Sequence, residues 1–99
     1  DKRILKMIQE QHKSQRLIAA ICAAPLILHE AGLLDEIRYT AHSSTYDILT
    51  RPVPNIPCVL HRNILTAPGA GTSTLFALKI VELLTSPSVC EKIRHSICA

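Results

Sequence analysis

Cys22 is the residue whose type and position most directly suggest chemistry. It ends the apolar run Leu17–Cys22, which has the length of a strand, and Pro25 then starts a helical pattern. Such junctions collect functional groups in open α/β sheets, because the strand end lies at the carboxyl edge and the first helical turn offers free N–H groups. These N–H groups favour a thiolate, so we expect Cys22 to be nucleophilic and readily oxidised. The alternative is a small buried apolar side chain, which most isolated cysteines are.

Two further groups are expected at the same edge of the sheet. His42 follows Arg38–Ala41, which the sequence predicts to be a short second strand. Imidazole accepts a thiol proton near neutral pH, so Cys22 and His42 form a candidate nucleophile and base, although a histidine after a strand is often only a hydrogen-bonded loop residue. The turn Gly69-Ala70-Gly71 could bind an anion, but it lacks the P-loop lysine and the full dinucleotide fingerprint. We therefore expect this turn to let backbone approach the site.

The elements that must position these residues can be predicted from hydrophobic spacing. Leu17–Cys22 is continuously apolar and is predicted to be a central parallel strand covered on both faces. An amphipathic surface helix is predicted from Lys2 to His12, whose basic residues are assigned to a solvated face rather than to a membrane surface. Further helices are predicted from Pro25 to Ala31 with Gly32 as the stop, from Thr74 to Leu84, and after Ser86-Pro87.

The segments between these elements carry turn signals. Arg51–Pro57 holds three prolines and is predicted to be a stiff, irregular connector. Cys58–Leu60 and Ile64–Thr66 flank a three-residue turn and predict a β-hairpin. The remaining predictions are local: a turn or cap at His42-Ser43-Ser44, a short helical segment at Tyr46–Leu49, and an N-cap at Thr72 or Ser73.

Length and composition exclude several classes of protein. A chain of 99 residues, 47% of them hydrophobic, fits one small globular domain and not a disordered segment. The net charge of +3 is too small and too dispersed for a nucleic-acid surface, and no apolar run approaches the roughly 20 residues of a membrane span. Four cysteines without a C-x-x-C pair and five histidines without zinc spacing predict free thiols, a cytoplasmic protein and no metal site.

Several segments together resemble the ThiJ/PfpI family, whose best-known member is a parkinsonism-associated deglycase. The resemblance is carried, in the family's order, by Leu17–Pro25, His29–Leu34, Tyr39–His42, Pro68–Ser73 and Phe76–Glu82. It implies a flavodoxin-like three-layer α/β sandwich with a parallel sheet, usually dimeric, with no metal or organic cofactor. Residues 1–99 are similar only to the C-terminal half of one such domain, so the N-terminal half is expected to be absent.

The resemblance also assigns roles to residues of the site. Cys22 matches the cysteine of the nucleophile elbow, His42 the neighbouring histidine, and the Ala23 amide one oxyanion donor. The family's second donor and its carboxylate have no counterpart and are expected outside this chain. Ala23 stands where PfpI-type peptidases have histidine, which disfavours peptidase activity. The expected substrate pocket consists of Ala24, where the deglycase-like branch commonly has glycine, Gly69, Ala70, where many members have proline, and Gly71.

Three interpretations of function follow from the resemblance. The intact protein is an enzyme that uses Cys22 on reactive dicarbonyls such as methylglyoxal, in the manner of a glyoxalase III or deglycase. Alternatively, it is a redox-sensing, chaperone-like protein of oxidative stress that responds through oxidation of Cys22. Thirdly, the 99 residues are an inactive fragment. The family's name also carries a thiazole monophosphate biosynthesis label, which we regard as nomenclature because no thiazole phosphate site is recognisable. The expected partners are the N-terminal half of the same protein, a second copy and a small aldehyde or dicarbonyl substrate.

Overall fold

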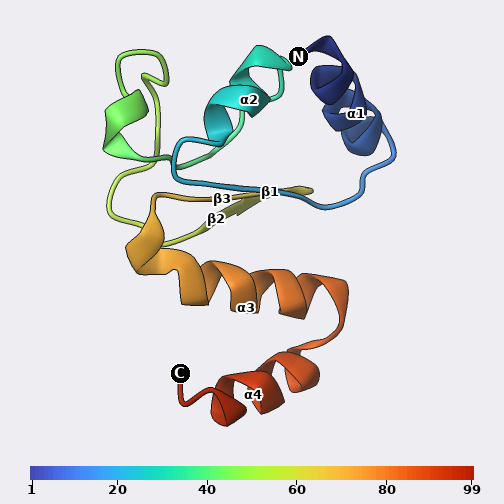
Figure 1. Cartoon of the computed structure of the whole chain (residues 1–99), viewed down its shortest axis with the longest axis vertical. Coiled ribbons are helices and arrows are strands. Elements are labelled where there is room, and N and C mark those ends of the chain that lie inside the picture. The colour runs from blue at the N-terminus through green and yellow to red at the C-terminus, as the bar shows by residue number, and fades with distance from the viewer.

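A three-stranded sheet separates two layers of helices in the computed structural model, which describes residues 1–99 (Figure 1). Helices α1 (Lys2–Lys13) and α2 (Pro25–Glu30) lie on one face of the sheet. Helix α3 (Ser73–Leu84) lies against the other face, and α4 (Pro87–Ser96) packs on the outer side of α3. The α/β layering agrees with the predicted class. None of the helices has both the length and the apolar character needed to cross a bilayer.

The sheet contains β1 (Ile18–Ile21), β2 (Val59–His61) and β3 (Ile64–Ala67) in the order β1-β3-β2. Strand β1 runs parallel to β3, with Ile18 opposite Ile64, and β2 runs antiparallel to β3. The turn between β2 and β3 uses a left-handed residue, Arg62, with φ of 56°. The predicted hairpin and the parallel direction of β1 are therefore confirmed.

The position predicted for β1 is wrong within this chain. Strand β1 lies at an edge of the sheet, whereas β3 is the central strand and is buried at all four positions. Ile18 and Ala20 are buried but Ala19 is exposed, so β1 is not covered on both faces. The cause is that only one edge of β1 is paired, and its N–H and C=O groups on the other edge meet no strand.

The predicted second strand at Arg38–Ala41 is absent. The Arg38 N–H donates to His61 Nδ1 at 3.1 Å, and the Thr40 N–H donates to Thr66 Oγ1 at 2.9 Å. Because these N–H groups bond to side chains, the segment runs beside the sheet without a strand ladder. The helical segment predicted at Tyr46–Leu49 is also displaced: a 3₁₀ helix, η1 (Ser43–Thr45), comes first and a turn follows it.

Most helix boundaries follow the predicted start and stop residues. Pro25 occupies the first turn of α2, and Gly32 follows that helix with a left-handed φ of 78°. The Ser86 hydroxyl accepts the Val89 N–H at 3.2 Å and so caps α4. Thr72 stands at the N-cap position of α3, but its hydroxyl donates to the Gly69 carbonyl at 2.9 Å instead of accepting from the helix.

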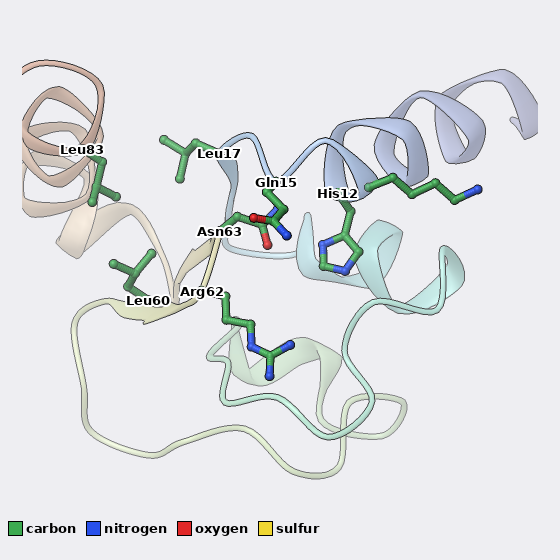
Figure 2. Close-up of a pocket in the computed structure, with 8 residues that line it drawn as sticks. His12, Gln15, Leu17, Leu60, Arg62, Asn63 and Leu83 are labelled. Carbon is green, nitrogen blue, oxygen red and sulfur yellow. The ribbon is translucent and has the colours of Figure 1, made fainter.

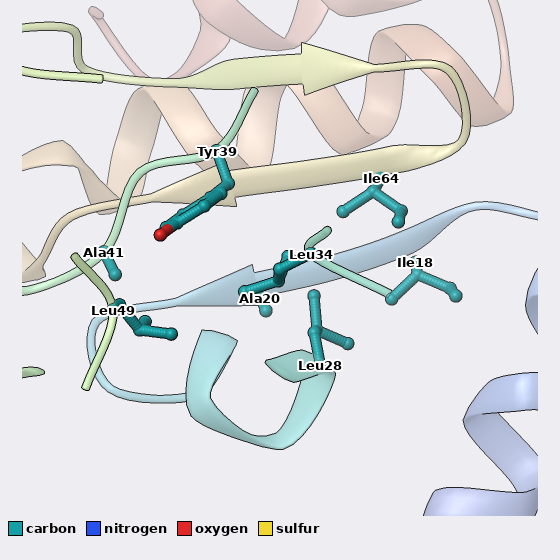
Figure 3. Close-up of a cluster of buried hydrophobic side chains, with 8 residues drawn as sticks. All are labelled: Ile18, Ala20, Leu28, Leu34, Tyr39, Ala41, Leu49 and Ile64. Carbon is teal, nitrogen blue, oxygen red and sulfur yellow. The ribbon is translucent and has the colours of Figure 1, made fainter. Parts of the chain in front are cut away.

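The hydrophobic core lies between α2 and the sheet and holds the irregular segment that follows α2 (Figure 3). Leu28 of α2 faces Ile18 and Ala20 of β1 in this cluster. The cluster is completed by Leu34, Tyr39, Ala41, Leu49 and Ile64. Ala41 has no exposed surface. Burial of Ala41 therefore anchors the main chain immediately before His42.

Candidate active site

The elbow that follows β1 holds Cys22 in a left-handed conformation, with φ of 64°. Its N–H donates to the Ala67 carbonyl at 2.9 Å, and the Ala24 N–H donates to the Ile21 carbonyl at 3.1 Å, which closes the turn. A left-handed conformation costs a residue with a side chain about 1–2 kcal/mol, and such strain concentrates at functional sites. The Cys22 thiol is exposed, so the alternative of a buried apolar side chain is wrong.

The main chain of His42 is tied directly to this elbow. Its N–H donates to the Cys22 carbonyl at 2.8 Å. The glycine turn lies beside the imidazole of His42, since a Cβ placed on Gly69 would be 3.6 Å from His42 Cδ2. The structure therefore brings together the three elements that the sequence predicted at one sheet edge: the elbow, His42 and the glycine turn.

Unpaired amides surround this arrangement. The Ala23 N–H has no acceptor within the chain, while its carbonyl accepts the Leu26 N–H at 3.1 Å. The N–H groups of Ala70 and Gly71 also donate to no acceptor, and both residues are exposed. Free amides of this kind can hydrogen-bond a negatively charged oxygen. The unpaired Ala23 amide belongs to the residue directly after Cys22.

The imidazole of His42 is held by the short helix that follows it. Its Nδ1 accepts the Ser44 N–H at 3.1 Å and lies 2.9 Å from Ser44 Oγ. The His42 carbonyl accepts both the Thr45 N–H at 3.0 Å and the Thr45 hydroxyl at 2.7 Å. The sequence indicated a cap at this position, but not that the imidazole itself is the capping acceptor. Ser44 is therefore a site residue that the sequence analysis missed.

A cavity of about 430 Å³ adjoins His42. Pro68 and Thr72, on either side of the glycine turn, contribute to its wall, and Tyr46 and Asn55 contribute from the irregular segment. The predicted pocket residues Ala24 and Gly69 are half-buried near the elbow and His42 rather than in the wall of this cavity. Ala70 and Gly71 do not line this cavity either.

A second cavity, of about 740 Å³, lies at the other end of the sheet (Figure 2). It is bounded by Leu17, which precedes β1, by Arg62 in the hairpin turn, and by His12 near the end of α1. Cys22 follows the opposite end of β1. This cavity is therefore remote from the candidate active site.

The other ionisable groups do not add to the site. No group of three or more His, Cys, Asp or Glu side chains is close enough together to hold a metal ion. All four cysteines are free; Cys90 is buried and its thiol donates to the Leu78 carbonyl at 3.2 Å. Burial raises the pKa of the Cys58 thiol, and the positive charge of Lys79 opposes that rise. The ion pairs, Arg3–Asp1, Lys79–Glu82 and Arg94–Glu91, include neither Cys22 nor His42.

Comparison with known proteins places this geometry in a family. The model of the DJ-1/PfpI family matches residues 1–83. The chain is 34% identical over 96 residues to the glutathione-independent glyoxalase DJR-1.2 of Caenorhabditis elegans, covering 94% of this chain and 51% of that protein. It is 32% identical over 94 residues to Protein dj-1beta of Drosophila melanogaster, covering 92% and 50% respectively.

Solved structures give the same result for the fold. The crystal structure of Drosophila melanogaster DJ-1beta superposes with a TM-score of 0.91 at 28% identity, covering 100% of this chain and 55% of that one. Oxidized Toxoplasma gondii DJ-1 superposes with a TM-score of 0.84 at 27% identity, covering 95% and 52%. The flavodoxin-like α/β class is confirmed. The chain spans about half the length of the relatives that it matches.

Proposed function

The chain belongs to the DJ-1/PfpI family, and from that premise we propose that the intact protein is a cysteine-dependent enzyme acting on reactive dicarbonyls such as methylglyoxal. The observation that carries this proposal is the exposed Cys22 thiol in a strained elbow, directly before the unpaired Ala23 amide. Two relatives, from Caenorhabditis elegans and Schizosaccharomyces pombe, are named glutathione-independent glyoxalases, which supports the same class of substrate.

The proposed reaction begins with attack of the Cys22 thiolate on the aldehyde carbon. A C–S bond forms, the carbonyl electron pair moves to oxygen, and the Ala23 amide stabilises the oxyanion. The oxyanion re-forms a carbonyl as a hydride moves, with the C–H electron pair, from the former aldehyde carbon to the neighbouring ketone carbon. The new alkoxide takes a proton from water, which gives a thioester beside a secondary alcohol. Water cleaves the thioester and releases lactate and the thiol. The aldehyde carbon is oxidised and the ketone carbon reduced, so water is the only co-reactant.

The enzyme proposal is tested with the full-length protein and its cysteine variants. We expect wild type to convert methylglyoxal to lactate and Cys22→Ser to abolish the conversion, because serine at this position is a much weaker nucleophile. Cys98→Ser is the matched control, since Cys98 is also exposed and also left-handed, with φ of 59°. Unchanged lactate formation in Cys22→Ser would exclude the mechanism.

Exposure of Cys22 also supports the second candidate, a redox-sensing, chaperone-like role in oxidative stress. In that role Cys22 is oxidised to a sulfinic acid, and binding of other proteins is the output. Mild peroxide treatment followed by mass spectrometry measures the oxidation of each cysteine. We expect oxidation of Cys22 before Cys58, Cys90 and Cys98; equal oxidation of all four would remove the physical basis of a sensor.

The unpaired edge of β1 supports a proposal about partners. An open strand edge pairs readily with another strand. Since the chain spans about half of its relatives, we propose that the N-terminal half of the protein, or a second copy, completes the site. Intact-mass analysis and light scattering of the purified protein distinguish the two partners. A well-folded, monomeric species of 99 residues would refute the proposal and leave the interpretation as an inactive fragment.

A further inference from the structure

We propose that the imidazole of His42 acts as a hydrogen-bond donor with its proton on Nε2, and that Ser44 is the positioning residue that sets this tautomer. The inference rests on the proposed function of the site. It specifies what His42 contributes there: a hydrogen bond to developing negative charge, and not removal of the thiol proton from Cys22.

The tautomer follows from the hydrogen bonds at Nδ1. A backbone amide can only donate, and the Ser44 N–H points at His42 Nδ1 from 3.1 Å. A proton on Nδ1 would therefore face the amide hydrogen of Ser44. A neutral imidazole carries one proton, so when Nδ1 is the acceptor the proton lies on Nε2. The Ser44 hydroxyl, 2.9 Å from the same nitrogen, can rotate to donate or to accept, so it is compatible with this tautomer and the backbone amide is the group that selects it.

The ring of His42 turns Nδ1 towards η1 and the opposite edge towards the glycine turn. Nδ1 is turned towards η1, so Nε2 and Cδ2 occupy the other side of the ring. Cδ2 is the atom that faces Gly69, at 3.6 Å from the position of a Cβ there. The main chain of His42 is meanwhile bonded to the Cys22 carbonyl at 2.8 Å. The protonated nitrogen thus belongs to the ring edge beside the glycine turn.

A proton on Nε2 distinguishes two catalytic roles of His42, general base and hydrogen-bond donor. A general base needs a lone pair on the nitrogen that faces the reacting group, and a protonated Nε2 has none. A neutral histidine with Nε2–H can instead donate to a substrate oxygen, as in enzymes where a helix N-terminus keeps the imidazole neutral. The proton of Cys22 must then be taken by a base other than His42. His42 and the Ala23 amide would share the negative charge that develops on the substrate oxygen.

The tautomer is tested by long-range ¹H–¹⁵N NMR on the ¹⁵N-histidine-labelled full-length protein, which distinguishes a protonated from an unprotonated ring nitrogen. The signal of His42 is assigned by its loss in His42→Gln. We expect a proton on Nε2 and none on Nδ1 when the ring is neutral. A neutral ring protonated on Nδ1 would overturn the proposal, whatever the activity of the protein.

A pair of proline variants tests the role of Ser44. Ser44→Pro removes the amide N–H, and we expect it to give a mixture of the two neutral tautomers. Ser43→Pro is the matched control: it keeps the Ser44 amide, and the extended backbone of His42, with ψ of 143°, suits a residue before proline. An unchanged tautomer in folded Ser44→Pro would overturn the assignment to Ser44. If Ser44→Pro does not fold, Ser44→Ala decides: it keeps the amide and must keep the proton on Nε2.

Activity gives a second, independent readout. Glutamine at position 42 can donate a hydrogen bond but cannot take up a proton, whereas alanine can do neither. Loss of one oxyanion donor lowers kcat by roughly 10²–10³-fold, so we expect that loss in His42→Ala and at least partial recovery in His42→Gln. Equal loss in the two variants would overturn the donor role. Failure of wild type to form lactate would instead refute the proposed function and leave the NMR result standing.

Discussion

Replacing Cys22 by glycine should remove the strain stored in the elbow. In the left-handed region a Cβ costs about 1–2 kcal/mol, while the extra freedom of glycine in the unfolded chain costs about 0.5–1 kcal/mol. With φ of 64° at Cys22, glycine should therefore be more stabilising than alanine by about 0.5–1 kcal/mol. The Cys22 thiol is exposed, so its removal sacrifices little packing and alanine is a fair reference.

The neighbouring residue provides the control. Ala23 is also exposed but is not left-handed, so glycine there should lower the free energy of unfolding by about 0.5–1 kcal/mol relative to alanine. Urea denaturation of the full-length wild-type, Cys22→Ala, Cys22→Gly and Ala23→Gly proteins measures both differences, provided that the slope with urea is the same. The difference in unfolding free energy between glycine and alanine should have opposite signs at positions 22 and 23. A lower stability of Cys22→Gly than of Cys22→Ala would refute this expectation.

Two further predictions concern packing and ionisation. Leu65 has no exposed surface, so Leu65→Ala should lower the free energy of unfolding by about 2–5 kcal/mol. Leu60 is 39% exposed, so Leu60→Ala should lower it much less. Similar midpoints of urea unfolding in the two variants would contradict this difference. Since burial raises the pKa of Cys58, its thiol should stabilise the fold below its ordinary pKa and lose that contribution as the pH rises through the folded-state pKa. Lys79→Met should raise the pKa of Cys58 further and slow its alkylation at pH 8, while Cys98 reacts at an unchanged rate. Faster alkylation of Cys58 would show that the charge of Lys79 does not lower the pKa of Cys58.

Periodicity and turn residues were sufficient to predict the helices, the hairpin and the place of the elbow. Apolar spacing predicts α1 and α3, Ser86-Pro87 predicts the start of α4, and Gly32 predicts the end of α2. Apolar spacing and turn residues are local signals, so they do not depend on contacts with a partner chain. The expectation that His42 and the glycine turn meet the elbow rests on the general rule that the carboxyl ends of parallel strands share an edge.

Features that depend on contacts between distant residues could not be predicted in this way. Arg38–Ala41 has the composition of a strand, but the amide of Thr40 bonds to the hydroxyl of Thr66, which is 26 residues away. The left-handed conformation of Cys22 has no signal in its residue type, and its N–H bonds to the carbonyl of Ala67, far along the chain. The edge position of β1 likewise depends on which strands are present to pair with it.

The hydrogen bond from the Cys22 N–H to the Ala67 carbonyl joins residues that are synthesised at different times. Synthesis proceeds from the N-terminus, so Cys22 leaves the ribosome before the strand that constrains it has been made. Until β3 docks beside β1, the bond from the Cys22 N–H to the Ala67 carbonyl cannot form, and the elbow has only its local bond from the Ala24 N–H to the Ile21 carbonyl. The elbow is therefore completed only when β3 is in place, by tertiary folding as well as by its own local turn.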